Sequence, residues 1–209
     1  MPAATDDDDT LMQAWMQGQV QAFDRLYQRH HAALYRFVRR VLGPAAAHQA
    51  DEVFQDTWTR VIQARERWAP QGATFRTWLF TLAHHRAVDL LRRSGRETSV
   101  DDHHPAEEAQ NGDGAWADWP AAESGHGADG DPADLAFWRA AGQRLLHCLD
   151  GLPVAQRAAF LLHHEDGFSV DDLARALEIG FETAKSRLRY AMNKLRTCMG
   201  AYLPAVDWR

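Results

Sequence analysis

The stretch SVDDLARALEIGFETAKSRLRY, residues 169–190, decides the fold because it reads as two short helices joined by a tight turn. Ser169, with Asp172 three positions later, matches the N-cap signature of a helix. Gly180 interrupts the pattern and can cap the helix that follows. The first helix has one apolar face at helical spacing, formed by Val170, Leu173, Ala174 and Leu177.

The second helix of this stretch separates apolar from polar residues. Its apolar side is formed by Ala184, Leu188, Ala191 and Leu195. Its other side is basic and rich in hydrogen-bonding groups, namely Lys185, Ser186, Arg189, Tyr190 and Asn193. A short helix, a glycine-containing turn and such a second helix are typical of a helix-turn-helix, whose second helix enters the major groove of DNA. The alternative is an ordinary helical hairpin with a solvated basic face.

Several motifs around this stretch resemble the −35 promoter-binding domain of bacterial sigma factors, most closely the extracytoplasmic-function (ECF) group. The motifs are LPVAQR (152–157), FLL (160–162), DGFS (166–169), DLA (172–174) and TAKSRL (183–188), within a match that covers residues 145–203. The resemblance implies an upstream promoter contact by Thr183, Lys185, Ser186, Arg187, Arg189 and Tyr190.

Two residues of the turn depart from the family pattern. Glu178 stands where the family usually has a turn glycine, and Gly180 stands where it usually has a serine cap. The flexible position is moved rather than lost. We therefore expect the helix-turn-helix to form, with a tilt of its second helix that the pattern does not fix.

Composition and charge limit the classes of protein to which the chain can belong. A chain of 209 residues with 45% hydrophobic residues can form one large or two small domains. The net charge of −6 is segregated, since residues 94–134 hold eleven acidic residues and one basic residue. The flanking segments are therefore basic, which suits nucleic-acid binding despite the acidic total. No apolar run could span a membrane, and the acidic start is unlike a signal peptide, so we expect a cytoplasmic protein.

The two cysteines, Cys148 and Cys198, have no metal-ligand spacing, and reduced thiols are expected for them. The histidines occur mostly as adjacent pairs, whose rings point in different directions on a helix. Neither pattern is that of a metal site, and no phosphate loop or nucleophile motif is present. We expect no metal, no cofactor and no enzymatic activity.

Residues 10–93 follow a helical period, with breaks at Gly43-Pro44 and around Pro70, and a last helix that ends at Ser94-Gly95. Three motifs here are similar to the −10-binding and polymerase-binding domain of ECF factors: ADEVFQDTW (50–58), TFRTWLFTLA (74–83) and RAVDLLRR (86–93). We predict an all-α chain with two small helical domains joined by a long acidic flexible linker. The predicted segments are a disordered acidic N-terminus (1–9), a region 2-like domain (10–96), the linker (97–134) and a region 4-like domain (135–203).

Two sets of residues in the first domain are candidate contacts. Glu52, Gln55, Asp56 and Thr59 recur at helical spacing as a polar stripe, which is either a solvated face or, as the resemblance implies, the surface that docks onto the clamp helices of the polymerase. The resemblance implies −10 DNA contacts by Thr77, Thr81, His84, His85, Arg92 and Arg93. The loop 67–74 matches the position of the family loop that captures a flipped base.

The composition of the linker predicts that it has little structure of its own, because the segment is poor in apolar residues. Trp116 and Trp119 are either incidental there or anchors for a partner. In relatives this linker threads polymerase channels that otherwise hold nucleic acid, and an acidic chain can imitate that polyanion.

The resemblance therefore predicts an alternative sigma factor. Its partners would be core RNA polymerase, through the clamp helices and the β-subunit flap, promoter DNA, and an anti-sigma factor. The alternative is a helix-turn-helix regulator with an N-terminal helical sensing or dimerisation domain.

Overall fold

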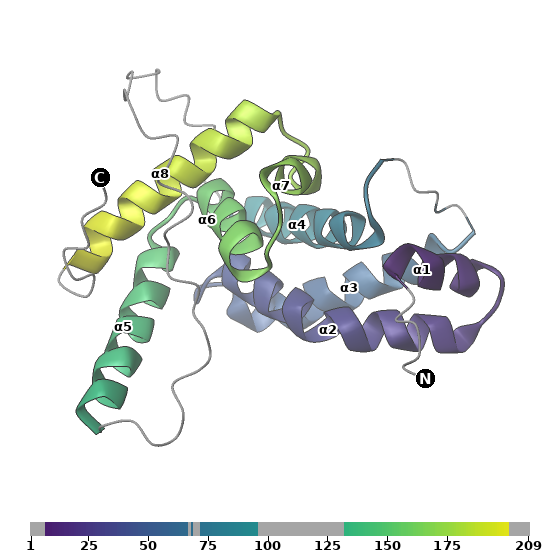
Figure 1. Ribbon diagram of the computed structural model, residues 1–209, viewed down its shortest axis with the longest axis horizontal. Helices are drawn as coiled ribbons and strands as arrows, with labels where there is room; N and C mark the ends of the chain where they lie inside the picture. Colours follow the sequence, from purple (N-terminus) through teal and green to yellow (C-terminus); the bar gives the residue numbers. More distant parts are fainter. Residues whose placement is uncertain (1–6, 67, 69–71, 96–131, 201–209) are drawn as a thin grey trace.

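The computed structural model describes residues 7–66, 68, 72–95 and 132–200, and the regular elements within these ranges are all helical, as predicted (Figure 1). The N-terminal domain contains α1 (Asp8–Met16), α2 (Val20–Leu42), the 3-10 turn η1 (Ala47–Gln49), α3 (Ala50–Gln63) and α4 (Phe75–Arg93). The C-terminal domain contains α5 (Pro132–Asp150), α6 (Val154–Phe160), the π-helical turn η2 (Leu161–Glu165), α7 (Val170–Ala176) and α8 (Phe181–Met199).

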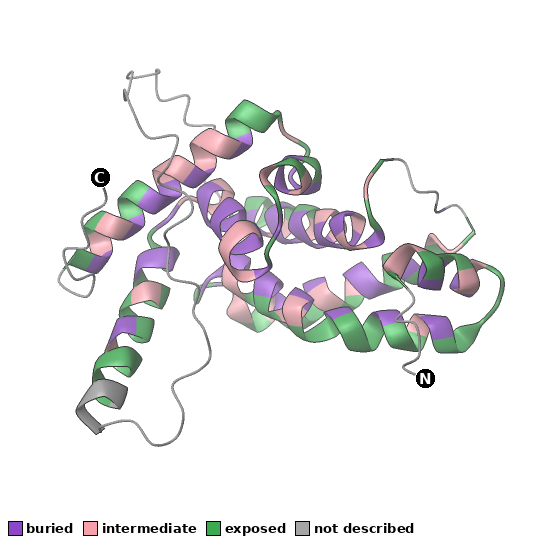
Figure 2. Cartoon of the chain, in the orientation of Figure 1, coloured by how far each residue is buried: buried purple, intermediate pink, exposed green. Residues whose placement is uncertain are grey.

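The helices of the N-terminal domain begin and end at the local signals of the sequence. α2 ends at Leu42 because Gly43 adopts a φ of 66°, a left-handed value that glycine tolerates without strain. α4 begins after Thr74, whose hydroxyl accepts a hydrogen bond from the Thr77 amide. The three helices α2, α3 and α4 pack on one another and bury their apolar faces (Figure 2).

The acidic N-terminus is ordered from residue 7, which corrects the predicted disordered segment 1–9. Asp7 caps α1 by accepting a hydrogen bond from the Thr10 amide. Asp8 binds Arg29 and lies 2.7 Å from the His30 ring nitrogen. Asp9 accepts a hydrogen bond of 2.7 Å from the Phe75 amide, where its charge favours the N-terminal end of α4. Three of the aspartates therefore belong to the fold, because α1, α2 and α4 each supply a partner for one of them.

The helix-turn-helix is present as predicted. Ser169 caps α7 by accepting from the Asp172 amide at 3.1 Å, and α8 begins directly after Gly180. Glu178 has a φ of 52° and makes the left-handed turn that the family usually gives to glycine. Glutamate is strained there, but the turn is preserved, and the Ile179 amide donates back to the Ala174 carbonyl at 2.9 Å.

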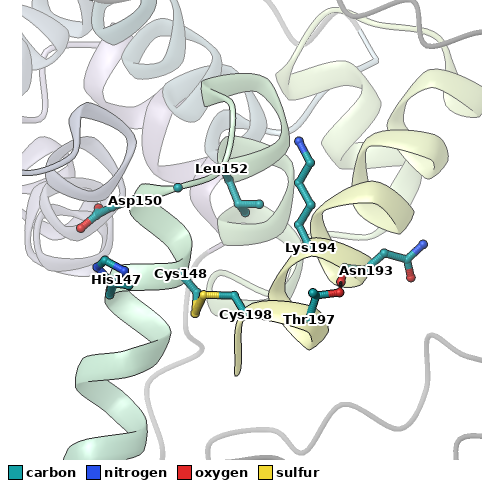
Figure 3. Close-up of a pocket in the computed structure, with 9 residues that line it drawn as sticks. His147, Cys148, Asp150, Leu152, Asn193, Lys194, Thr197 and Cys198 are labelled. Carbon is teal, nitrogen blue, oxygen red and sulfur yellow. Dashed lines mark hydrogen bonds between the residues drawn. A yellow bond between two sulfur atoms is a disulfide. The ribbon is translucent and has the colours of Figure 1, made fainter. Parts of the chain in front are cut away.

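Cys148 and Cys198 form a disulfide, which corrects the expectation of reduced thiols. Fifty positions separate them in the sequence, but α5 packs against α8 and brings their Cα atoms to 5.8 Å. The bond lies beside a hollow of about 740 Å³ between the end of α5 and the last turns of α8, lined also by Asp150, Leu152 and Lys194 (Figure 3).

The two domains are in contact, and we call this the closed arrangement. α7 packs against α4, and α6 packs against α2 (Figure 1). Most of the acidic linker, with Trp116 and Trp119, lies outside the described residues. Among the helices that are described, none has the length and apolar character needed to cross a bilayer.

Candidate nucleic-acid interface

The helix α8 leaves a polar surface available because its apolar residues are buried in the C-terminal domain. Ala184, Leu188 and Leu195 have no exposed surface, and α8 packs against α5, α6 and α7. The six residues predicted to contact the upstream promoter element lie outside this buried stripe: Thr183 is exposed, and Lys185, Ser186, Arg187, Arg189 and Tyr190 are partly exposed. They are spread around the helix and do not share one face, since Arg187 and Arg189 flank the buried stripe on opposite sides. Arg187 lies toward the N-terminal domain, because its charge acts on His84 of α4.

Two local contacts organise this surface. The Ser186 hydroxyl donates to the Thr183 carbonyl at 3.0 Å. The Arg189 guanidinium lies 5.3 Å from the centroid of the Tyr190 ring, within the range of a cation–π contact. Stacking of this kind limits the rotamers of a long side chain, so Arg189 is partly ordered before any ligand binds.

The polar stripe of α3 is exposed at three of its four predicted residues, Glu52, Gln55 and Thr59. Asp56 differs because its carboxylate forms an ion pair with Arg86 of α4, and a longer one of 3.6 Å with Arg60. Asp56 therefore links α3 to α4. Helical spacing places it correctly on the stripe, but spacing within one helix carries no information about a partner on another.

The six residues of α4 that the resemblance assigns to −10 DNA are not all exposed, which corrects the expectation for two of them. Thr77 is 2% exposed and His84 is 8% exposed. Thr81 is half-buried and donates its hydroxyl to the Thr77 carbonyl at 2.9 Å. The other three residues of this predicted set are exposed, namely His85, Arg92 and Arg93.

The buried residues of α4 form two stripes. One, which includes Phe75, Leu79 and Ala83, belongs to the core of the N-terminal domain. The other consists of Thr77, Phe80, His84 and Val88, and lies on the side where α7 packs. The ring centroids of Phe80 and Phe168 are 5.2 Å apart across this contact. Two of the six α4 residues that the resemblance assigns to DNA, Thr77 and His84, thus lie in the stripe on the side where the C-terminal domain packs.

Burial changes the proton affinity of His84. Loss of solvent lowers the pKa of its imidazole to about 3, and the charges of His85, Arg187 and Arg92 act in the same direction. Its Nδ1 atom is buried, and the described residues offer it no hydrogen-bond partner. His84 is therefore neutral in the closed arrangement at any pH near 7.

The domain contact contains residues that the sequence analysis did not select, chiefly Arg76, Glu165 and Phe168. Their local patterns are ordinary, and only the tertiary fold brings them together. Across the described ranges, no group of three or more histidine, cysteine, aspartate or glutamate side chains is arranged to hold a metal ion.

Two family models match the chain in the order of its two domains: Sigma-70 region 2 over residues 26–97 and Sigma-70 region 4 over residues 142–195. The ECF RNA polymerase sigma factor SigK of Mycolicibacterium vanbaalenii is 30% identical over 200 residues, which cover 96% of this chain and 93% of that protein. SigK of Mycobacterium ulcerans is 30% identical over 202 residues, covering 96% and 97%.

Two solved structures share the fold. CnrH in complex with the cytosolic domain of CnrY matches with a TM-score of 0.61 and 22% identity, over 93% of this chain and 99% of that one. The sigma factor RpoE of Bartonella quintana, in complex with the anti-sigma factor NepR, matches with a TM-score of 0.58 and 23% identity, over 86% and 97%.

The paired helical domains and their helix-turn-helix define an RNA polymerase sigma factor of the sigma-70 type. Within that class, the chain belongs to the ECF sigma factors. A helix-turn-helix regulator with an unrelated N-terminal domain does not fit these matches, because both sigma regions are present.

Proposed function

We propose that α8 reads the −35 element, that α4 reads the −10 element, and that the exposed stripe of α3 binds core RNA polymerase. The observation that carries the proposal is the surface of α8, where Thr183, Ser186, Arg189 and Tyr190 lie on the side away from the core and are exposed or partly exposed. The chain acts as an initiation factor in the cytoplasm and contributes no catalysis of its own.

The reading of the −35 element is tested by Arg189→Ala. A side chain that contacts a base edge contributes about 1–3 kcal/mol of discrimination, whereas a phosphate contact weakens all sequences alike. Arg189→Ala should therefore change the preferred base at one or two −35 positions in a promoter-library transcription assay.

Lys194→Ala is the control for Arg189→Ala, because Lys194 is an exposed basic residue of the same helix outside the proposed set. It should leave the preferred sequence as it is. If Arg189→Ala lowers output uniformly over the library, Arg189 contacts the backbone and the assignment of the reading surface is wrong.

Core binding is assigned to Glu52, Gln55 and Thr59, since these side chains are exposed on one face of α3. An acidic and amide surface suits a basic partner helix. Glu52→Lys with Gln55→Ala should weaken binding to core polymerase about tenfold or more in a titration, with unchanged helicity. Asp56→Asn is unsuitable as the principal test, because Asp56 also joins α3 to α4. Equal affinity of the double variant and the parent would remove α3 as the docking surface.

Promoter opening is assigned to α4 and the loop before it. His85, Arg92 and Arg93 can contact phosphates and base edges, and an unstacked base held in a pocket favours the melted strand without ATP. Residues 67 and 69–71 of the loop lie outside the described residues, so no side chain is assigned to base capture.

An anti-sigma factor is the further partner that we propose. The support is that RpoE, which shares the fold, was solved with the anti-sigma factor NepR. Co-purification of the full chain with a co-expressed candidate, and loss of core binding in its presence, would test this partner.

A further inference from the structure

We propose that α1 positions the start of α4 and the end of α3, and that opening of the −10 region depends on this contact. The two positioning residues of α1 are Asp9 and Trp15. The proposal rests on the proposed function, which assigns promoter opening to α4 and the loop before it. It adds a helix outside the proposed DNA-binding set on which that step depends.

The start of α4 is fixed through the backbone of Phe75, its first residue. The first amides of a helix have no acceptor within the helix. Asp9 of α1 supplies one, because its carboxylate accepts a hydrogen bond of 2.7 Å from the Phe75 amide. The hydroxyl of Thr74, which is the local cap, accepts from the Thr77 amide instead. The first amide of α4 is therefore bound by a residue 66 positions earlier in the chain.

The side chain of Phe75 is also fixed by α1, through His30 of α2. Phe75 has no exposed surface, and the centroid of its ring lies 5.8 Å from that of His30. The His30 ring nitrogen lies 2.7 Å from the Asp8 carboxylate, so α1 orients this imidazole. Two consecutive aspartates of α1 thus act on one residue of α4, since Asp9 binds its amide and Asp8 orients the ring beside it.

The end of α3 is fixed by a stacking contact. Arg65 lies two residues beyond α3, and its guanidinium is 4.4 Å from the centroid of the Trp15 ring, within the range of a cation–π contact. Trp15 is itself 9% exposed, and its ring centroid lies 5.1 Å from that of Phe23 in α2. Gly18, in the turn after α1, has a φ of 96°, and a Cβ atom there would lie 3.3 Å from the Arg65 guanidinium. Glycine therefore suits both the turn and the space beside Arg65.

Both contacts belong to one short helix. α1 packs on α2 and also contacts α4, at the end of the domain where α4 begins (Figure 1). Fixing the ends of a connection between two helices reduces the number of conformations open to it, so less entropy is lost when the connection binds a ligand. An unstacked base is such a ligand, and its capture has to repay the cost of unpairing. We therefore expect α1 to make opening more favourable without touching the DNA.

The test is the rate of −10 opening by the full chain bound to core polymerase, measured by permanganate oxidation of the −10 thymines. Asp9→Ala should slow the opening of a duplex promoter about three- to tenfold, the range that corresponds to one lost hydrogen bond. The same promoter with a mismatched, pre-opened −10 region is the second template. Asp9→Ala should give the parental yield of transcript on it, because no base pair has to be broken there.

Two further variants separate positioning from stability. A variant that only loses folded protein lowers the activity on both templates alike. Asp9→Asn keeps a side-chain oxygen that can accept from the Phe75 amide, so it should recover most of the duplex opening rate. Asp24→Ala is the matched control, because Asp24 is an exposed aspartate of α2 for which the described residues provide no ion pair. It should behave like the parent on both templates.

The free chain gives a second measurement that needs no polymerase. The Phe75 amide should exchange with solvent at least about tenfold faster in Asp9→Ala than in the parent, and at the parental rate in Asp24→Ala. An unchanged exchange rate in Asp9→Ala would overturn the inference.

The inference is also overturned if Asp9→Ala opens the duplex promoter as fast as the parent, or if it lowers the activity on both templates equally. If the parent itself opens no promoter with core polymerase, the proposed function of α4 fails instead. The exchange rate of the Phe75 amide would then still report whether Asp9 fixes the start of α4.

Discussion

His84 and Asp166 are buried ionisable residues whose pKa values move in opposite directions for the same reason. Loss of solvent lowers the pKa of the His84 imidazole to about 3. Loss of solvent, together with the neighbouring charge of Glu165, raises the pKa of the Asp166 carboxyl to about 7. In both residues burial favours the neutral form. The stability of the fold should therefore depend on pH near neutrality.

We expect His84→Gln to remove an acid sensitivity of the fold. The unfolded chain binds a proton at His84 below pH 6.5, whereas the folded chain does not until about pH 3, so acid favours unfolding. The parent should lose about 2 kcal/mol of unfolding free energy relative to His84→Gln between pH 7 and pH 5. Urea unfolding of both proteins at the two pH values measures this difference.

The comparison between variant and parent isolates His84 from the opposing effect of Asp166. A carboxyl whose pKa is raised on folding costs stability as the pH rises from about 4 to about 7, but this cost is common to both proteins. His85→Gln is the control, since His85 is exposed. If the difference in unfolding free energy between parent and variant is the same at pH 7 and at pH 5, then His84 takes up its proton as readily in the folded chain as in the unfolded chain, and the prediction is wrong.

Helix boundaries could be predicted from the sequence because the signals that set them are local. Ser169 and Thr74 act as caps, and Gly43 ends α2 by its own backbone conformation. The start of α1 could not be predicted, because a run of aspartates is also typical of a disordered terminus. One of the donors that hold these aspartates is the Phe75 amide, which lies far from them in the sequence.

Contacts between elements could not be predicted in this way. The ion pair from Asp56 to Arg86 and the disulfide from Cys148 to Cys198 join helices whose approach is set by packing. The burial of Thr77 and His84 has the same origin, because α7 packs against α4 and no pattern within α4 indicates that contact.

The pair α5 and α8 should depend on the disulfide for a large part of its stability. A cross-link over a sequence separation of 50 residues restricts the unfolded chain, and the chain-entropy model gives about 4 kcal/mol for it. We expect a reducing agent to lower the urea midpoint of the parent clearly. Far-ultraviolet circular dichroism followed during urea unfolding, with and without the reductant, gives the measurement.

The double variant Cys148→Ala with Cys198→Ala is the control for this prediction. It should unfold at the lower midpoint, and the reductant should not change that midpoint. Two reactive thiols in the denatured, non-reduced parent would show that the bond is absent and would remove the prediction.

The whole molecule separates its charges along the chain, and the acidic segment 94–134 has the opposite sign to the domains on either side. A polyanion in this place can compete with nucleic acid for basic surfaces. We therefore propose that the linker acts within the polymerase complex and is dispensable for folding.

Deletion of residues 113–129 should leave the helical fold in place, because the buried core of the described residues is formed entirely by other parts of the chain. It should lower the yield of full-length transcript relative to short abortive transcripts on a promoter that the parent recognises. A second variant keeps the length of segment 113–129 but has glycine and serine in place of its acidic residues. It distinguishes the effect of the linker's charge from the effect of its length. Parental transcription by both variants would contradict a role for the acidic segment.

The bond between Cys148 and Cys198 makes the backbone from residue 148 to residue 198 a covalent ring that contains α6, α7 and α8. A single protease cut inside the ring leaves both fragments attached, so the recognition helix stays with the rest of the molecule. The two ends of the ring are 5.8 Å apart at their Cα atoms. The segment 148–198, which carries the helix-turn-helix, therefore has ends that nearly coincide in space. It could be inserted into a surface loop of another protein with little change to the structure of that protein.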